Sequence, residues 1–210
     1  MTGAIINTVL AYLLGSVSGS LVVGSWRHVD IRLAGSGNAG GTNAFRTQGF
    51  RFALGVVLID VGKGVIATVA LSRISLPGLE QVLGLPAQMA LCGFAAVLGH
   101  CYPIWHGFRG GKGAATALGV VCVIQPVALI PMLLCWLLVL TLSGWVGLAT
   151  MLAGLSLVPT MLWLDAGLPY LLFSLSLAGF LVFTHRSNIR NMMGGREFRF
   201  ERAMLRNWFR

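Results

Sequence analysis

The sequence predicts an all-α polytopic membrane protein. Of its 210 residues, 56% are hydrophobic and only 10% are charged, whereas about a quarter of the residues of soluble domains are charged. The stretch from Ala114 to Thr184 contains 71 residues and one charge, Asp165. A run of this length and apolarity is typical of several membrane spans in succession. We expect a single integral-membrane domain over residues 1–210.

The Lys and Arg residues are gathered in a few short segments. Four of the fifteen lie between Arg27 and Arg51, two are Arg109 and Lys112, and seven follow His185. Basic residues concentrate in cytoplasmic segments of membrane proteins, so these three regions and the C-terminus are predicted to be cytoplasmic. No basic residue precedes the first apolar stretch, which predicts an external N-terminus without a signal peptide. The net charge of +9 therefore reflects topology, and no nucleic-acid partner is expected.

Three spans are predicted before the long apolar tract. The first covers residues 4–25, the second covers residues 52–71 and the third covers residues 86–105. The polar stretch Ser72 to Gln81 between the second and third spans is expected outside. Each of the three spans has the length that a membrane helix requires.

The long tract from Ala114 to Thr184 must contain an even number of crossings if Lys112 and Arg186 are both cytoplasmic. Two helices of ~35 residues would each be about 52 Å long, against a hydrocarbon core of ~30 Å. Four crossings fit better, and turns are expected at the breaks Gln125-Pro126, Ser143-Gly144 and Asp165 to Gly167. The total is about seven transmembrane helices.

Residues 190–210 form a basic, amphipathic C-terminal tail. Arginines recur every three or four residues at positions 196, 199, 202, 206 and 210, and apolar residues fill the remaining arc. This spacing predicts a helix that lies on an anionic lipid surface. A solvated tail without a defined helix is the alternative.

A first polar cluster lies between the first two spans. It combines small hydrogen-bonding residues with an arginine, which suits a two-pronged grip on phosphate; its members are Ser36, Gly37, Asn38, Thr42, Asn43 and Arg46. The glycines at positions 35, 37 and 40 match the spacing of a dinucleotide-binding loop, but no βαβ unit surrounds them. An ordinary polar connector is the alternative interpretation.

A second cluster follows the third span and leads into the long apolar tract. Its members are Arg109, Gly110, Gly111, Lys112 and Gly113. The Walker pattern fails here, because His106 stands where a glycine is required and Gly113 replaces the Ser or Thr. Glycine amides, a lysine and a following helix start nevertheless form a phosphate-binding turn. The alternative is a glycine turn whose lysine is anchored at lipid headgroups.

A third cluster closes the last span. His185 and Asn188 are three residues apart and share one face of a continuing helix. The alternative role of His185 is to anchor the chain at the membrane interface. Asp60 and Lys63, near the middle of the second span, are candidates because charges within membranes are often functional; a mutually neutralising pair that braces the site is the simpler hypothesis. No metal-ligand spacing is present, so neither metal nor cofactor is expected.

Together, the three clusters resemble the acyl-phosphate–glycerol-3-phosphate acyltransferase family (PlsY). The shared motifs are Gly35-Ser36-Gly37-Asn38 with Thr42-Asn43 and Arg46-Thr47, then Phe108 to Gly113 with Ala115-Thr116, then His185-Arg186-x-Asn188-Ile189 with Gly195 and Glu197. Order, spacing and chain length agree over essentially the whole chain. The sequence departs from the family pattern at Val17-Ser18-Gly19 and at Gly41, positions that concern packing.

The resemblance implies seven helices, an active site at the cytoplasmic membrane face and a bacterial inner-membrane location. It implies transfer of a fatty acyl group from acyl phosphate to the sn-1 hydroxyl of glycerol 3-phosphate, and contact with the enzyme that produces acyl phosphate. Ser36, Arg46 and Lys112 would bind phosphate, while His185 and Asn188 would orient the hydroxyl. Glu197 would brace the third motif. The alternative function is a membrane transporter of a phosphorylated solute, which predicts polar groups near the midplane and inverted repeats.

Overall fold

The computed structural model describes residues 2–75 and 82–207, and every regular element in these ranges is a helix. The chain divides into two compact units, Met1–Ile124 and Gln125–Arg210. The division falls at Gln125-Pro126, one of the predicted breaks. Whether the two units act as one domain stays a prediction.

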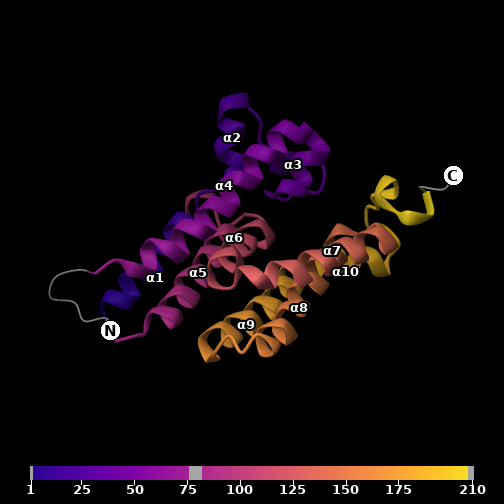
Figure 1. Cartoon of the computed structure of the whole chain (residues 1–210). Coiled ribbons are helices and arrows are strands. Elements are labelled where there is room, and N and C mark those ends of the chain that lie inside the picture. Colours follow the sequence, from indigo (N-terminus) through magenta and orange to yellow (C-terminus); the bar gives the residue numbers. More distant parts are fainter. Residues whose placement is uncertain (1, 76–81, 208–210) are drawn as a thin grey trace. The chain divides into compact units, whose positions relative to one another are not determined.

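The first unit is built around α4 (Phe50–Val69), which packs against all the other α-helices of this unit (Figure 1). These are α1 (Thr2–Gly15), α2 (Gly19–Arg27), α3 (Gly41–Gln48), α5 (Leu85–Cys101) and α6 (Ala114–Ile124). Short 3₁₀ turns connect them at Ile31–Leu33 (η1), Leu71–Arg73 (η2) and Ile104–His106 (η3). The second and third predicted spans are confirmed as helices. The predicted external stretch lies outside the described residues from position 76 to 81.

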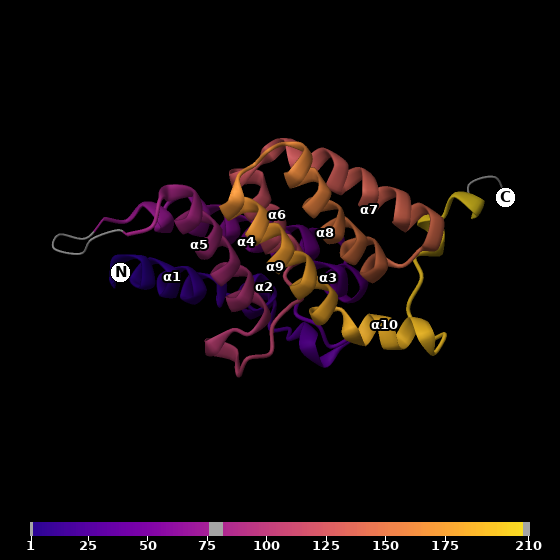
Figure 2. The ribbon, with the colours of Figure 1, turned by 90° about the horizontal axis from the view of Figure 1, so that it is seen from below.

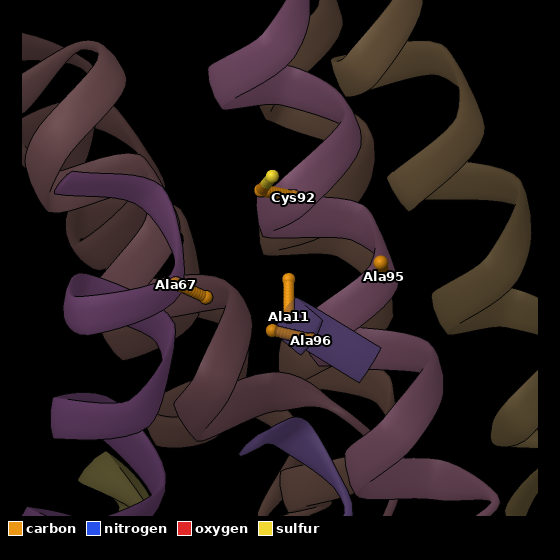
Figure 3. Packing of buried hydrophobic residues seen from close by; sticks show 5 residues of the cluster. All are labelled: Ala11, Ala67, Cys92, Ala95 and Ala96. Carbon is orange, nitrogen blue, oxygen red and sulfur yellow. The ribbon is translucent and has the colours of Figure 1, made fainter. Parts of the chain in front are cut away.

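Small side chains allow α1, α4 and α5 to approach one another closely. Figure 3 shows the cluster in which they meet, made of Ala11, Ala67, Cys92, Ala95 and Ala96. A Cβ atom on Gly99 of α5 would run into the backbone of Tyr12 and Ser16 at the end of α1. Close contact between small residues is a principal source of helix association in membranes, where lipid removes most of the hydrophobic driving force.

The second unit is a row of helices in which α8 (Val146–Trp163) lies between α7 (Leu129–Ser143) and α9 (Leu168–Thr184), as Figure 2 shows. The turn η4 (Pro126–Ala128) precedes α7, and α10 (Arg186–Met193) follows α9. The four helices expected between Lys112 and Arg186 are therefore present as α6 to α9, with breaks at the three predicted places.

Five segments among the described residues are long and apolar enough to cross a membrane, with α1 and α2 counted together. A sixth forms if α9 and α10, which are bent by 50°, are one span. The apolar helix α6 has 11 residues and is about 16 Å long, which is shorter than the ~30 Å hydrocarbon core. Seven crossings and the orientation of the chain stay predictions.

The predicted continuous helix in the C-terminal tail is wrong. After α10 ends at Met193, residues 194–200 contain no helix, and only the short 3₁₀ turns η5 (Glu201–Ala203) and η6 (Leu205–Asn207) follow. Contacts with the α7–α8 turn explain this path: Phe200 N–H donates to the carbonyl of Gly144 at 2.8 Å, and the Arg199 guanidinium lies 4.4 Å above the Trp145 ring. Residues 208–210 lie outside the described part of the chain.

Candidate active site

The first polar cluster is a loop held together by Asn43, a buried residue of α3. Its side-chain oxygen accepts from the Ser36 amide at 2.9 Å, and its Nδ2 donates to the carbonyls of Ile31 at 2.9 Å and Ala34 at 3.0 Å. Gly35 lies at φ +61°, where a side chain would be strained and would also meet the Asn43 oxygen. Asn43, expected to contact substrate, is therefore occupied in shaping the loop.

The other members of this cluster surround that scaffold. Ser36 is exposed, Asn38 and Thr42 are half-buried, and Gly37 turns the loop at φ +70°. Arg46 lies one helical turn beyond Thr42 on α3 and is half-buried. These residues keep the polar and cationic character that a phosphate ligand requires.

An ion pair connects this loop to the region of the second cluster. Arg32 contacts both carboxylate oxygens of Asp30, from Nε at 3.0 Å and Nη2 at 2.7 Å, and its Nη1 donates to the carbonyl of His106 at 3.5 Å. The hydrogen bonds from Arg32 hold the pKa of the Asp30 carboxyl below its usual value. The loop and the glycine-lysine turn thus share an anchor within the first unit.

The second cluster is a turn whose glycine amides are partly occupied. The amides of Gly110 and Gly111 donate to the carbonyls of Cys101 at 3.2 Å and His100 at 3.1 Å, which cap the C-terminal end of α5. These two amides therefore have protein partners in this conformation, and their expected contact with a phosphate stays a prediction. A helix leaves its first N–H groups without intrahelical partners, so we expect the first-turn amides of α6 after Lys112 to be the ones that bind an anion.

Lys112 and Arg109 supply the charge of this turn. Lys112 is half-buried directly before α6, while Arg109 is exposed. The amide of Ala117 donates to Gly113 at 2.8 Å, so α6 begins immediately after the turn. A cation and a helix N-terminus therefore lie side by side.

His185 of the third cluster is the residue at which α9 bends into α10. It is 5% exposed, and its Nδ1 lies 2.8 Å from the Leu181 carbonyl. Because a carbonyl oxygen only accepts, Nδ1 carries the proton and Nε2 is the basic nitrogen of the neutral ring. An open polar pocket of about 290 Å³ is lined by Thr184, Arg186, Ser187 and Arg190, which flank His185 in the sequence. The sequence hypothesis missed Arg190, although a second arginine one turn after Arg186 signals anion binding.

Asn188 is fixed from two sides. Its Nδ2 donates to Glu197 Oε1 at 2.7 Å, and its side chain lies against Gly147 of α8, where an added Cβ would be 2.8 Å from Asn188 Cγ. The contact between Glu197 and the third motif agrees with the expected bracing position.

The Asp60–Lys63 pair is confirmed as a buried ion pair, with 2.9 Å between Nζ and Oδ1. Lys63 also lies 2.9 Å from Nδ1 of His100, a residue outside the three predicted clusters. No sequence signal identifies this third member, because His100 lies 37 residues further along the chain.

The structure thus places the first two clusters and the buried pair in the first unit, and the third cluster with Glu197 in the second unit. Convergence of all three clusters on one site stays a prediction.

Comparisons with known proteins agree with these motifs. A family model described as glycerol-3-phosphate acyltransferase matches residues 5–195. A glycerol-3-phosphate acyltransferase of Pseudomonas aeruginosa is 38% identical, over 91% of this chain and 97% of its own. A crystal structure of PlsY, an integral membrane glycerol 3-phosphate acyltransferase in its glycerol 3-phosphate form, is 33% identical with a TM-score of 0.84 and covers 99% of both chains. The lysophosphatidic acid form of PlsY gives 33% identity and a TM-score of 0.82, over 94% of this chain and 95% of that one.

The match extends over the whole set of polar clusters and over the apolar helices that carry them. The chain therefore belongs to the glycerol-3-phosphate acyltransferase family as an integral membrane protein.

Proposed function

We propose that this protein transfers a fatty acyl group from acyl phosphate to the sn-1 hydroxyl of glycerol 3-phosphate, yielding lysophosphatidate and inorganic phosphate. The observation that carries the proposal is the similarity over nearly the full chain to PlsY in glycerol 3-phosphate and lysophosphatidic acid forms, which are an acceptor and a product of this reaction. Transport of a phosphorylated solute is not favoured, because the family to which the chain belongs is one of acyltransferases.

The reaction needs no covalent enzyme intermediate, because acyl phosphate is already activated. The acceptor oxygen attacks the acyl carbonyl carbon, the bond from that carbon to the phosphate oxygen breaks, and phosphate departs. The hydroxyl proton goes to Nε2 of His185 or to the departing phosphate. The Nδ1 hydrogen bond to Leu181 supports the first route, since it leaves Nε2 basic.

The cationic and polar groups of the first two clusters bind the phosphate groups of the substrates. Ser36, Arg46 and Lys112 bind and neutralise phosphate, helped by Arg109 and by the polar groups around Gly37, Asn38 and Thr42. The Gly113 amide and the first-turn amides of α6 complete the anion site. Gly110, Gly111 and Asn43 act indirectly, by shaping the two loops through the hydrogen bonds described above.

The acceptor hydroxyl is oriented by the third cluster. The Asn188 amide donates to Glu197 through Nδ2, which turns its oxygen, an acceptor, away from that carboxylate. Together with His185, this oxygen would receive the hydroxyl. The site lies at the cytoplasmic face of a bacterial inner membrane in a chain with seven crossings and an external N-terminus, and it receives acyl phosphate from the enzyme that produces it. The grouping of basic residues supports this orientation.

The test is a coupled measurement on the purified, detergent-solubilised protein. Incubation with palmitoyl phosphate and glycerol 3-phosphate should release phosphate and form lysophosphatidate in equal amounts, and omission of the acceptor should stop both. Glycerol without phosphate should be a poor acceptor, because the cationic groups then lack a ligand. Formation of lysophosphatidate from an acyl thioester but not from acyl phosphate would disprove the proposed donor.

A further inference from the structure

Three ionisable side chains meet in the interior of the first unit. Asp60 is 0% exposed, and Lys63 and His100 are each 4% exposed. The Lys63 ammonium has three acceptors, one for each of its N–H groups: Asp60 Oδ1 at 2.9 Å, His100 Nδ1 at 2.9 Å and the Val17 carbonyl at 2.7 Å. His100 Nδ1 also lies 3.3 Å from Asp60 Oδ1, so each of the three side chains contacts the other two.

This cluster also supplies hydrogen-bond partners to backbone groups at the break between α1 and α2. The helix is interrupted from Ser16 to Ser18, which frees backbone groups inside an apolar environment. Lys63 donates to the Val17 carbonyl, and Asp60 Oδ1 accepts from the Gly19 amide at 3.1 Å. The ion pair thus fixes the backbone at the break within the first span.

The other end of the cluster touches the glycine-lysine turn. The Gly111 amide donates to the His100 carbonyl at 3.1 Å. The imidazole lies directly against the α-carbon of Gly111, so that an added Cβ would overlap Nε2 and come within 2.7 Å of Cε1. Lys112 is the residue that directly follows Gly111.

A stabilising role alone explains the cluster poorly. Replacement of a buried ion pair by apolar residues of similar volume is often neutral or stabilising, since desolvation offsets the attraction. Charges inside membrane helices are costly and are therefore usually tied to function. A device that fixes the backbone beside a phosphate-binding lysine supplies such a function.

We propose that Asp60, Lys63 and His100 form a positioning network that sets the conformation of the Gly110–Gly111 turn and thereby the place of Lys112. Lys63 and Asp60 orient the imidazole, and the imidazole supports the turn from beneath. The inference rests on the proposed function in one respect, because Lys112 is taken as the residue that binds phosphate.

The experiment compares two substitutions on α5. His100→Asn keeps a polar atom near the position of Nδ1, and so preserves a partner for Lys63, but it removes the part of the ring that touches Gly111. Gln88→Asn is the matched control: Gln88 is 1% exposed and donates to the Ala4 carbonyl at 3.2 Å, about 18 Å along the helix from His100. The kcat, the KM for glycerol 3-phosphate and the melting temperature are measured for both.

His100→Asn should lower kcat by about 100-fold, the size expected from a displaced catalytic group, while its melting temperature falls no further than that of Gln88→Asn. Equal kcat values in the two variants would overturn the proposal. A nitroxide at Phe108→Cys, a position with 56% exposure in the same turn, reports the mobility of the turn without requiring activity. Its mobility should rise in the His100→Asn background and stay unchanged in the Gln88→Asn background.

If His100→Asn does not fold, Lys63→Met takes its place, and the nitroxide mobility at position 108 is compared between Lys63→Met and Gln88→Asn. Unchanged nitroxide mobility would overturn the proposal, as would failure of both variants to fold, because the cluster would then belong to the folding core. An inactive wild-type protein would disprove the proposed function, and the mobility measurement would still decide the positioning role.

Discussion

The Nδ2 group of Asn188 donates a 2.7 Å hydrogen bond to Glu197 and so ties α10 to the segment that follows it. We predict that Glu197→Ala lowers kcat by about 10- to 100-fold, because the Asn188 amide then loses the partner that fixes its orientation. Initial rates of phosphate release with purified protein measure this effect. Glu197→Gln, which keeps an acceptor oxygen, should retain more activity than the alanine variant.

Glu201→Ala is the matched control for this prediction. Glu201 is an exposed acidic residue of the same segment, and the bond that Asn207 makes to it involves only its main-chain carbonyl. The control should keep wild-type kcat. Equal rates for Glu197→Ala and Glu201→Ala would show that Glu197 does not hold Asn188 in its active position.

Gly147→Ala should lower turnover by displacing the side-chain amide of Asn188. The added Cβ would lie 2.8–2.9 Å from Cγ, Cβ and Nδ2 of Asn188, closer than side-chain atoms normally pack, so the amide must move. Gly179→Ala is the control, because a Cβ at this helical glycine of α9 meets nothing within 4 Å. We expect a tenfold or larger loss of kcat for Gly147→Ala alone. Full activity in that variant would mean that the position of Asn188 is not critical.

Lys112→Ala should nearly abolish turnover while the protein remains folded. Removal of a preorganised charge from a phosphate in the transition state costs about 3 kcal/mol or more, and Lys112 lies in a half-buried turn outside the core. The measurements are kcat and the melting temperature, with Arg51→Ala, an exposed basic residue at the start of α4, as control. Near wild-type turnover would exclude Lys112 from the site.

Much of the helix pattern could be predicted from composition and from helix-breaking residues. Pro126 lacks a backbone donor, Gly144 takes φ +74° and Gly167 takes φ +81°, and all three break the long apolar tract where expected. The first span was predicted as one helix, yet it breaks at Ser16 to Ser18. The freed backbone groups there bond to Lys63 and Asp60, partners more than forty residues away that local sequence cannot reveal.

The sequence could suggest residues for the candidate site but not the contacts that support them. Residue types and motif spacing suggested Lys112 and His185, but not which backbone amides already have partners within the protein. Gly110 and Gly111 cap α5, and Asn43 folds its own loop, because backbone groups buried near a helix end must find partners. The arginine spacing of the tail suggested a helix, while the contact of Arg199 with Trp145 selects a different path.

His185→Ala should lower kcat by about 100-fold or more, the usual contribution of a general base. If Nε2 takes the hydroxyl proton, the wild-type rate should fall towards acidic pH, because protonation of the imidazole removes the base. The pH profile of kcat in a partly active His185→Gln variant is the decisive measurement. An acidic limb that persists unchanged in this variant would indicate that the departing phosphate accepts the proton instead.

Topology gives the prediction that depends least on the family. Single cysteines at Gln48, Phe108 and Met193 should resist a membrane-impermeant thiol reagent in intact cells, while a cysteine at Val82 should react. All four positions are exposed and already carry a side chain, at Phe108 even at φ +59°, unlike the neighbouring glycines 49 and 107. The background lacks the native cysteines Cys92, Cys101, Cys122 and Cys135.

Permeabilised cells serve as the control, since all four single-cysteine proteins should then react. The expectation follows from the grouping of basic residues, thirteen of fifteen of which lie in the three segments placed inside. Labelling of Phe108→Cys and Met193→Cys on opposite sides would require an odd number of crossings between them. The second and third polar clusters could then not meet at one membrane face, and the proposed active site would be wrong.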